Sequence, residues 1–289
     1  MKKLGDEQRA VMTRRDLVKL GAAGLAAAGM AGCASFGRGM HGDPAYRGLK
    51  VGVHTFSLRA YSFEKAVAIT KGLGVHYIGL KPKYHTSVDD PPEKLAAERA
   101  YIKNAGLHLM ACGVMSFKAS DPAGARKTFE YAKAMGMPVI VANLMPEDVG
   151  MLDPLVDEFG IRIAIHNHGP SSNFPRPEDL LRAIRGHHKY IGACVDIGHY
   201  TRAGVKAEDA LAALADRAYD MHLKDVSKAA EDGHTVVIGK GVIDFDAVAE
   251  QLLKMRFGYH VALEYESEKD NPVPSMRESL INFRKILNS

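Results

Sequence analysis

The sequence predicts a single α/β domain, a closed (β/α)8 or TIM barrel, that follows an N-terminal signal peptide. Apolar strand-like runs alternate with helical patterns eight times, which is typical of parallel strands joined by right-handed helical crossovers. The segment that contains them, residues 46–289, is close to the roughly 250 residues of a typical barrel. We therefore expect one barrel domain with its chemistry at the carboxyl ends of the strands.

Each expected element follows from its local pattern. Runs rich in Val, Ile, Leu and Ala predict strands at residues 50–55, 77–81, 108–114, 138–143, 162–166, 192–196, 219–223 and 260–264. Apolar spacing with one charged face predicts helices at residues 63–72, 92–105, 123–135, 146–158, 177–186, 207–216, 244–255 and 274–287. Glycines such as Gly106 and Gly136 follow several of these helices, as C-caps do. The first strand–helix turns contain no GxGxxG sequence, which counts against a dinucleotide-binding fold.

The first residues of the chain have the pattern of an export signal. Arg14 and Arg15 lie in a basic segment that resembles a twin-arginine signal, and residues 20–31 form an apolar run too short to span a bilayer. The string Met-Ala-Gly-Cys that ends at Cys33 resembles a lipobox. We expect a signal peptide at 1–32, a linker at 33–45 and the barrel at 46–289. The protein would then be periplasmic or lipid-anchored to the cell envelope through Cys33. The alternatives are a soluble secreted protein and an N-terminus that is basic and then apolar by chance.

The charge balance gives no case for nucleic acid as a partner. Residues 1–32 hold six of the 38 basic and three of the 34 acidic residues, so 32 basic and 31 acidic residues remain after export. Membrane contact is expected only through a lipid on Cys33. The other cysteines, Cys112 and Cys194, lie in apolar runs without a CxxC motif, which favours buried thiols over a disulfide or zinc site. The sequence leaves the oligomeric state open.

Four strand-like segments in the second half of the chain end in side chains that bind metals. The pairs at these ends are His166 and His168, Asp196 and His199, His222 and Asp225, and Glu264 and Glu266. Two neutral imidazoles and two carboxylates form a mixed nitrogen and oxygen set that suits a divalent first-row metal. Because strand ends converge on one rim of a barrel, we expect these side chains to lie close together.

Several of these residues have structural alternatives. Asp196 could cap the following helix, and a lone histidine at a strand end, such as His222, is more often structural. His166 and His168 share a face, so we expect one to be a ligand and the other to contact substrate. Glu266 either supports a ligand or lies at the rim. The pair His187-His188 is expected to be solvated or to cap a helix.

The first half of the chain offers fewer polar strand ends. Lys81 is a candidate proton shuttle or partner of a substrate oxyanion, while Asn143 is a weaker candidate. A long connection at residues 226–241 ends in Gly-Lys-Gly and could close over substrate or be a surface excursion. Substrate contacts are expected from His54, His85, His199, Lys224 and Lys240.

These motifs resemble the xylose isomerase-like TIM barrels, a family of sugar phosphate isomerases and epimerases. The resemblance implies metal ligands from a Glu after the fifth strand, an Asp in DxGH, a His in HxKD and a Glu after the eighth strand. Asp196, His222 and Glu264 match the last three, while His166, in HNHG, stands where many members have a Glu. This variant looks like an exported subgroup. We expect one divalent ion on these four residues, with manganese favoured and zinc, cobalt or magnesium as alternatives.

The expected chemistry is proton abstraction next to a carbonyl of a small sugar or keto-sugar. A divalent ion would act as a Lewis acid, and Glu264, His168 or Lys81 would be the base. A metal-bound His166 has no lone pair for a proton, so transfer is expected from one side only. The main interpretation is therefore a metal-dependent isomerase or epimerase, with isomerisation or elimination expected over inversion.

Three other functions remain as alternatives. They are a lyase acting on 3-keto-glycosides, a non-catalytic exported sugar-binding protein, and a nuclease related to the AP endonuclease barrel. The nuclease is disfavoured by the nearly neutral charge of residues 33–289.

Overall fold

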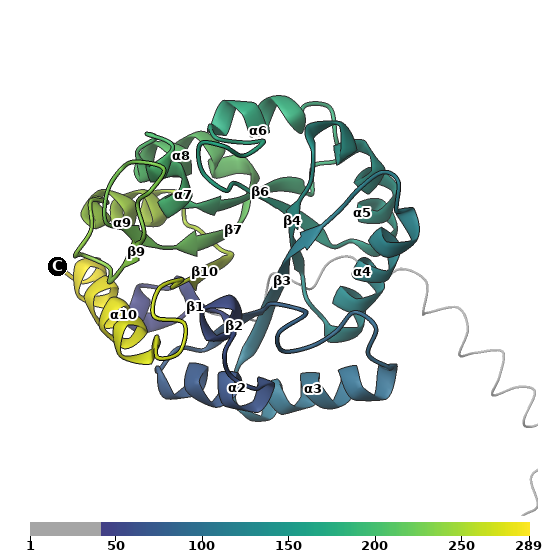
Figure 1. The fold of residues 1–289 in the computed structure, drawn as a ribbon, viewed down its shortest axis with the longest axis horizontal. Helices are drawn as coiled ribbons and strands as arrows, with labels where there is room; N and C mark the ends of the chain where they lie inside the picture. The colour runs from purple at the N-terminus through teal and green to yellow at the C-terminus, as the bar shows by residue number, and fades with distance from the viewer. Residues whose placement is uncertain (1–41) are drawn as a thin grey trace, which may run out of the picture. The chain divides into compact units, whose positions relative to one another are not determined.

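The structure, a computed structural model, describes residues 42–289 (Figure 1). The expected signal peptide, Cys33 and most of the expected linker lie outside the described residues. The described chain opens with a 3₁₀ turn, η1 (Pro44–Tyr46), which the side chain of Asp43 caps by accepting from the Ala45 N–H. Within residues 42–289, no helix is long and apolar enough to cross a membrane.

Eight parallel strands close into a barrel, as predicted. In chain order they are β1 (Lys50–His54), β2 (Tyr77–Leu80), β3 (His108–Ser116), β4 (Val139–Asn143), β5 (Arg162–His166), β6 (Ile191–Asp196), β7 (Ala218–Leu223) and β10 (His260–Leu263). Each strand pairs with its neighbours in chain order, and β1 pairs with β10 to close the sheet. Figure 1 shows the strands at the centre and the helices around them. The fold is therefore a (β/α)8 barrel.

The helices lie between the strands and cover the outside of the barrel. They are α2 (Phe63–Gly72), α3 (Pro92–Asn104), α4 (Pro122–Met135), α5 (Asp153–Phe159), α6 (Pro177–Ala183), α7 (Ile197–Arg202), α8 (Ala207–Leu214), α9 (Phe245–Lys254) and α10 (Val273–Leu287). Shorter 3₁₀ segments are η2 (Thr55–Leu58), η3 (Pro146–Leu152) and η4 (Ala215–Arg217).

Two local features differ from the sequence prediction. The helix expected at 146–158 is divided into η3 and α5, and Pro154 lies at the start of α5, where it has no N–H to donate to a preceding turn. The short helix α7 was not expected. It begins directly after β6 because the Asp196 side chain accepts a hydrogen bond from the His199 N–H at 2.8 Å and caps it.

The long connection after β7 is folded against the barrel. It contains a two-stranded antiparallel sheet, β8 (Asp225–Val226) with β9 (Thr235–Val236). The buried carboxylate of Asp225 accepts hydrogen bonds from the backbone N–H groups of Gly239 and Gly241, both at 2.9 Å. Asp225 therefore fixes the Gly-Lys-Gly turn at the end of the connection that the sequence predicts either to close over substrate or to be a surface excursion.

Buried apolar side chains form two separate clusters. The larger core lies between strands and helices and includes Cys112. A smaller cluster on other strand positions includes Ala111, Val141, Ala164 and Cys194. Both cysteines are buried free thiols, as predicted.

Strand register brings the ends of neighbouring strands to one level. His166 on β5 is the partner of Cys194 on β6, and Asp196 on β6 is the partner of His222 on β7. Because side chains two residues apart share a face, Cys194 and Asp196 point to the same side of β6. The register therefore places side chains from three consecutive strands around one point.

Candidate metal centre and active site

Four side chains that the sequence predicted as ligands come together at the carboxyl ends of the strands. His166, Asp196, His222 and Glu264 each offer one ligand atom, and these four atoms all lie within 4.8 Å of one another. The four residues are at most 4% exposed. They come from β5, β6, β7 and the residue after β10, so the convergence is a direct consequence of barrel closure.

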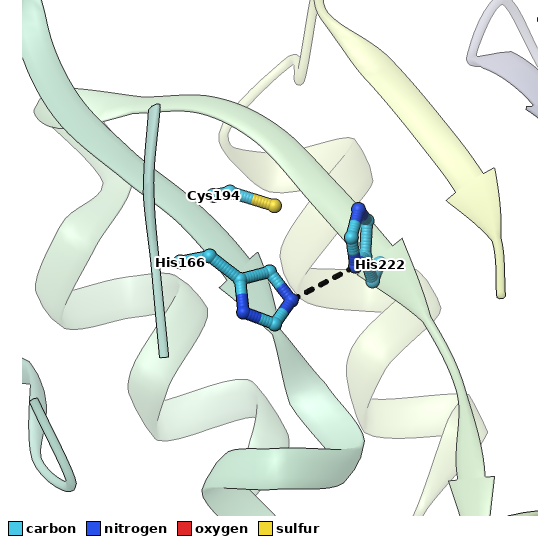
Figure 2. A group of neighbouring side chains, drawn as sticks. All are labelled: His166, Cys194 and His222. Carbon is cyan, nitrogen blue, oxygen red and sulfur yellow. Dashed lines mark hydrogen bonds between the residues drawn. The ribbon is translucent and has the colours of Figure 1, made fainter. Parts of the chain in front are cut away.

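The distances define a compact nitrogen and oxygen cluster. His166 Nε2 and His222 Nδ1 lie 3.0 Å apart, the pair joined by the dashed line in Figure 2. Asp196 Oδ2 lies 3.5 Å from each of these nitrogens, and Glu264 Oε2 lies 3.1 Å from His222 Nδ1. Two imidazoles with two carboxylates are a donor set that fits a divalent first-row ion.

Asp196 serves the fold and the cluster with different atoms. Its Oδ1 accepts from the His199 N–H and caps α7, while its Oδ2 faces His166 and His222. The Asn167 side chain holds the Asp196 backbone through two hydrogen bonds of 3.0 Å, one to each peptide group. Capping and metal binding, which the sequence left as alternatives, are therefore compatible in one residue.

Burial and neighbouring charges shift the pKa values of the side chains in the cluster. Burial opposes ionisation of Asp196 and Glu264, but neighbouring positive groups hold the pKa of both carboxyls well below the usual range. Burial lowers the pKa of His166 well below 6.5, so this ring is neutral and ready to donate a lone pair. His222 has a raised pKa and would have to lose its proton on binding an ion.

A buried lysine lies among the carboxylates. Lys224 is 1% exposed, and its Nζ lies 3.0 Å from Asp196 Oδ2, 2.9 Å from Glu264 Oε2 and 3.2 Å from Glu266 Oε2. Burial by itself lowers the pKa of Lys224, but Asp196 and Glu264 raise it well above its ordinary value. Lys224 was predicted to contact substrate, and the structure places its ammonium group on the carboxylates.

A cavity of about 210 Å³ lies next to the cluster. It is lined by His54, Phe56, Lys81, Val114, His166, His168, His199, Glu264 and Glu266. Four of the side chains predicted for catalysis or substrate binding, besides Glu264, are therefore in its wall. A second cavity of about 240 Å³, between α2 and α10, is lined by residues such as Gly72 and Arg277 and contains none of the predicted site residues.

Glu264 and His54 lie close together because β1, the first strand, pairs with β10, the last strand of the barrel. His54 Nε2 donates to the Gly113 carbonyl at 3.0 Å, because a carbonyl oxygen can only accept. The other ring nitrogen, Nδ1, lies 2.9 Å from Glu264 Oε1. His54 therefore contacts one oxygen of Glu264, while the other oxygen faces His222 and Lys224.

Two further basic groups lie in the cavity wall. Lys81 Nζ donates to the Val114 carbonyl at 2.5 Å, and burial lowers its pKa. His168 Nδ1 lies 3.3 Å from His166 Nδ1, and burial also lowers the pKa of His168. A buried lysine and a neutral imidazole in a cavity wall are both candidate groups for proton exchange with a substrate.

Other predicted residues lie outside the cavity wall. His85 is buried, and its Nε2 donates to the Leu58 carbonyl at 3.2 Å. Lys240 pairs with Glu278 at 2.6 Å, and its side chain is more than half exposed. Asn143 ends β4 and is exposed. His187 pairs with Asp153 at 2.8 Å, which agrees with a structural role for that histidine.

Sequence reasoning did not single out Phe56 and Val114 as wall residues. Phe56 lies in η2, two residues after His54, and Val114 follows the glycine whose carbonyl binds His54. Apolar residues carry no ligand signal, and their only available indication was proximity to the expected strand ends. Glu266, by contrast, lines the cavity, and its Oε2 lies 3.2 Å from Nζ of Lys224, which is not one of the four candidate ligands.

The fold and the cluster define a (β/α)8 barrel with a candidate metal centre at the carboxyl ends of its strands. A family model described as the xylose isomerase-like TIM barrel matches residues 26–286, and the chain belongs to that family. The resemblance stated from the motifs is therefore confirmed. No curated protein gives a significant match to the sequence.

Solved structures with the same fold include three informative ones. The probable 3-DHS dehydratase AsbF from Bacillus anthracis is 14% identical, with a TM-score of 0.69 over 83% of this chain and 99% of that chain. L-ribulose 3-epimerase is 15% identical, with a TM-score of 0.68 over 83% and 95%. The IOLI protein with a bound zinc atom is 15% identical, with a TM-score of 0.68 over 83% and 98%. At these identities the similarity shows the fold alone.

Proposed function

We propose that this protein is a metal-dependent isomerase or epimerase that removes a proton next to the carbonyl of a small sugar or keto-sugar. The observation that carries the proposal is the position of the four-residue cluster, which adjoins a cavity lined by Lys81, His168 and Glu264. L-ribulose 3-epimerase, which has the same fold, supports the class of reaction. The zinc atom in the IOLI protein supports a divalent cofactor. Manganese remains our favoured ion, with zinc, cobalt or magnesium as alternatives.

Different residues of this chain would bind the ion and transfer the proton. His166, Asp196, His222 and Glu264 would hold the ion, which supplies Lewis acidity toward a substrate carbonyl and its neighbouring hydroxyl. The group that accepts or returns the proton is Glu264, His168, whose ring is neutral, or Lys81, whose pKa is lowered by burial. His54 lies beside the Glu264 carboxylate, with its Nδ1 2.9 Å from Glu264 Oε1.

His166 makes proton transfer one-sided. In the resembling epimerases, glutamates after the fifth and eighth strands act from opposite faces of the substrate, whereas this chain has His166 at the first of these positions. A histidine that binds an ion through Nε2 carries its hydrogen on Nδ1, so neither nitrogen can accept a proton. We therefore propose that isomerisation or elimination is favoured over inversion. A lyase acting on 3-keto-glycosides is the second candidate, and the dehydratase of the same fold supports it.

The test is incubation of manganese-loaded protein with a panel of aldoses, keto-sugars and 3-keto-glycosides in D₂O. Deuterium at the carbon next to the carbonyl, detected by NMR and mass spectrometry, would support proton abstraction, and chelated protein is the control. Product structure then separates isomerase, epimerase and lyase. Binding of sugars without exchange for any substrate would favour the sugar-binding alternative. A clean epimer, formed at rates that fall equally in His166→Gln and Glu264→Gln with metal retained, would refute one-sided transfer.

We also propose that residues 1–32 direct export and that Cys33 carries a lipid, on the strength of the Arg14-Arg15 pair, the short apolar run and the sequence ending at Cys33. Mass spectrometry of the membrane fraction tests both parts. An intact Met1 on cytoplasmic protein would refute export, whereas a cleaved chain with an unmodified Cys33 would refute the anchor alone.

A further inference from the structure

A sulfur donor lies against the candidate metal centre. His166, Cys194 and His222 each offer one ligand atom, and these three atoms also lie within 4.8 Å of one another. Figure 2 shows the Cys194 Sγ directed toward the space between the two imidazole rings. The three residues are at most 2% exposed. The two histidines therefore belong to two overlapping ligand sets, one completed by Asp196 and Glu264 and the other by Cys194.

The position of Cys194 follows from strand geometry. It is the register partner of His166, and it precedes Asp196 by two residues on β6. Side chains two residues apart share a face and lie about 6.6 Å apart along a strand. The thiol is therefore one layer further from the carboxyl end of β6 than the Asp196 carboxylate. In the described structure the cavity wall includes His166 but neither Cys194 nor His222.

We propose that Cys194 is an alternative ligand that thiophilic divalent ions such as Zn²⁺, Co²⁺ and Cd²⁺ recruit, whereas Mn²⁺ and Mg²⁺ stay on the carboxylates. The inference rests on the proposed metal centre and adds a selectivity to it. Thiolate sulfur prefers softer ions, and carboxylate oxygen prefers harder ones. Both sets draw on the imidazoles of His166 and His222, so the two sets would compete for the same side chains.

The opposing energies explain why the choice depends on the metal. The Cys194 thiol is fully buried and donates to Asp220 Oδ1 at 3.8 Å, a contact that a bound ion would have to replace, and a hard ion gains little from sulfur. When a soft ion binds, the metal–sulfur bond forms as the S–H bond breaks, and the proton leaves to water. An ion drawn toward Cys194 is also drawn away from the cavity wall. We therefore expect soft ions to bind tightly and to support less turnover than manganese.

Electronic absorption of the cobalt-loaded protein tests this inference. Purified protein is stripped of metal, loaded with one equivalent of Co²⁺ and compared in four forms: wild type, Cys194→Ser, Cys194→Ala and Cys112→Ser. Cys112 is the matched control because it is equally buried on a barrel strand but lies in the core beneath the helices. The wild type and Cys112→Ser should show a thiolate-to-cobalt charge-transfer band in the near ultraviolet. Both Cys194 variants should lose the band while still binding cobalt.

Cadmium affinity is the second measurement. Cys194→Ser should weaken Cd²⁺ binding by at least about 10-fold and leave Mn²⁺ binding within about 2-fold. Wild-type protein that binds one Co²⁺ without the charge-transfer band would overturn the role of Cys194 and leave the carboxylate centre standing. Persistence of the band in Cys194→Ala would also overturn it. Protein that binds no Co²⁺ at all would overturn both this inference and the metal centre on which it rests.

Discussion

The two halves of the barrel rim differ in chemistry. The ends of β5, β6, β7 and β10 carry the four candidate ligands, which are all buried and lie close to one another. The first three strands and the 3₁₀ segment η2 contribute His54 and Lys81 to the same cavity, together with the apolar Phe56 and Val114. One half carries the candidate ligands, and the other carries a candidate base and an apolar wall. The halves meet where β1 pairs with β10 and His54 contacts Glu264.

The largest expected effect lies in the ligand half. Asp196→Asn keeps an oxygen that can cap α7 but removes the charge on Oδ2, so metal content should fall to background and turnover by at least about 10³-fold. Elemental analysis and the deuterium-exchange assay measure these changes. Asp121→Asn is the matched control because Asp121 caps α4 through the same contact, at 2.9 Å from the Gly124 N–H, outside the site. Equal metal content in wild type and Asp196→Asn would disprove the centre.

The ligand half should also make the metal-free protein sensitive to acid. Burial lowers the pKa of His199 from 6.5 to about 4. The unfolded chain therefore binds a proton that the folded chain does not, and the free energy of unfolding should fall by about 3 kcal/mol as the pH decreases from 6.5 to 4. Urea denaturation across this range measures the slope. His199→Gln should reduce the slope, to which other buried histidines also contribute, while His76→Gln, at an exposed position, should leave it unchanged; identical slopes in all three proteins would contradict the assignment.

The base half should affect turnover without affecting the metal. Lys81→Met is expected to lower kcat by about 100-fold, within the range of general acid–base catalysis, because it removes a proton carrier from the cavity wall. Its metal content should equal that of wild type. Lys83→Met, two residues away and exposed, is the control and should retain full activity. Loss of metal in Lys81→Met would show that the two halves are not separate in function.

The smallest expected effect is at Lys240, on the turn held by Asp225. Its ion pair with Glu278 is exposed, so Lys240→Ala should change the free energy of unfolding by less than about 1 kcal/mol. The KM of the variant then decides the predicted substrate contact. An increase in KM with unchanged stability would mean that the turn brings Lys240 to the substrate, whereas an unchanged KM would remove Lys240 from the site.

The sequence by itself determined the barrel and the four residues of the candidate centre. Strand ends that stop on His166, Asp196, His222 and Glu264 are visible locally, and closure of eight parallel strands requires such ends to meet. Local signals also indicated His54, Lys81, His168 and His199, which lie in the cavity wall.

Only the tertiary structure decided what each of these residues contacts. The burial of Lys224 among three carboxylates, the contact of His54 with Glu264 and the approach of Cys194 to the two histidines depend on register between strands far apart in the sequence. The same is true of the two oxygens of Asp196, one capping a helix and one facing the centre. Residue spacing defines which face of a strand a side chain occupies. The residues that this side chain contacts lie on neighbouring strands, and closure of the barrel fixes the positions of those strands.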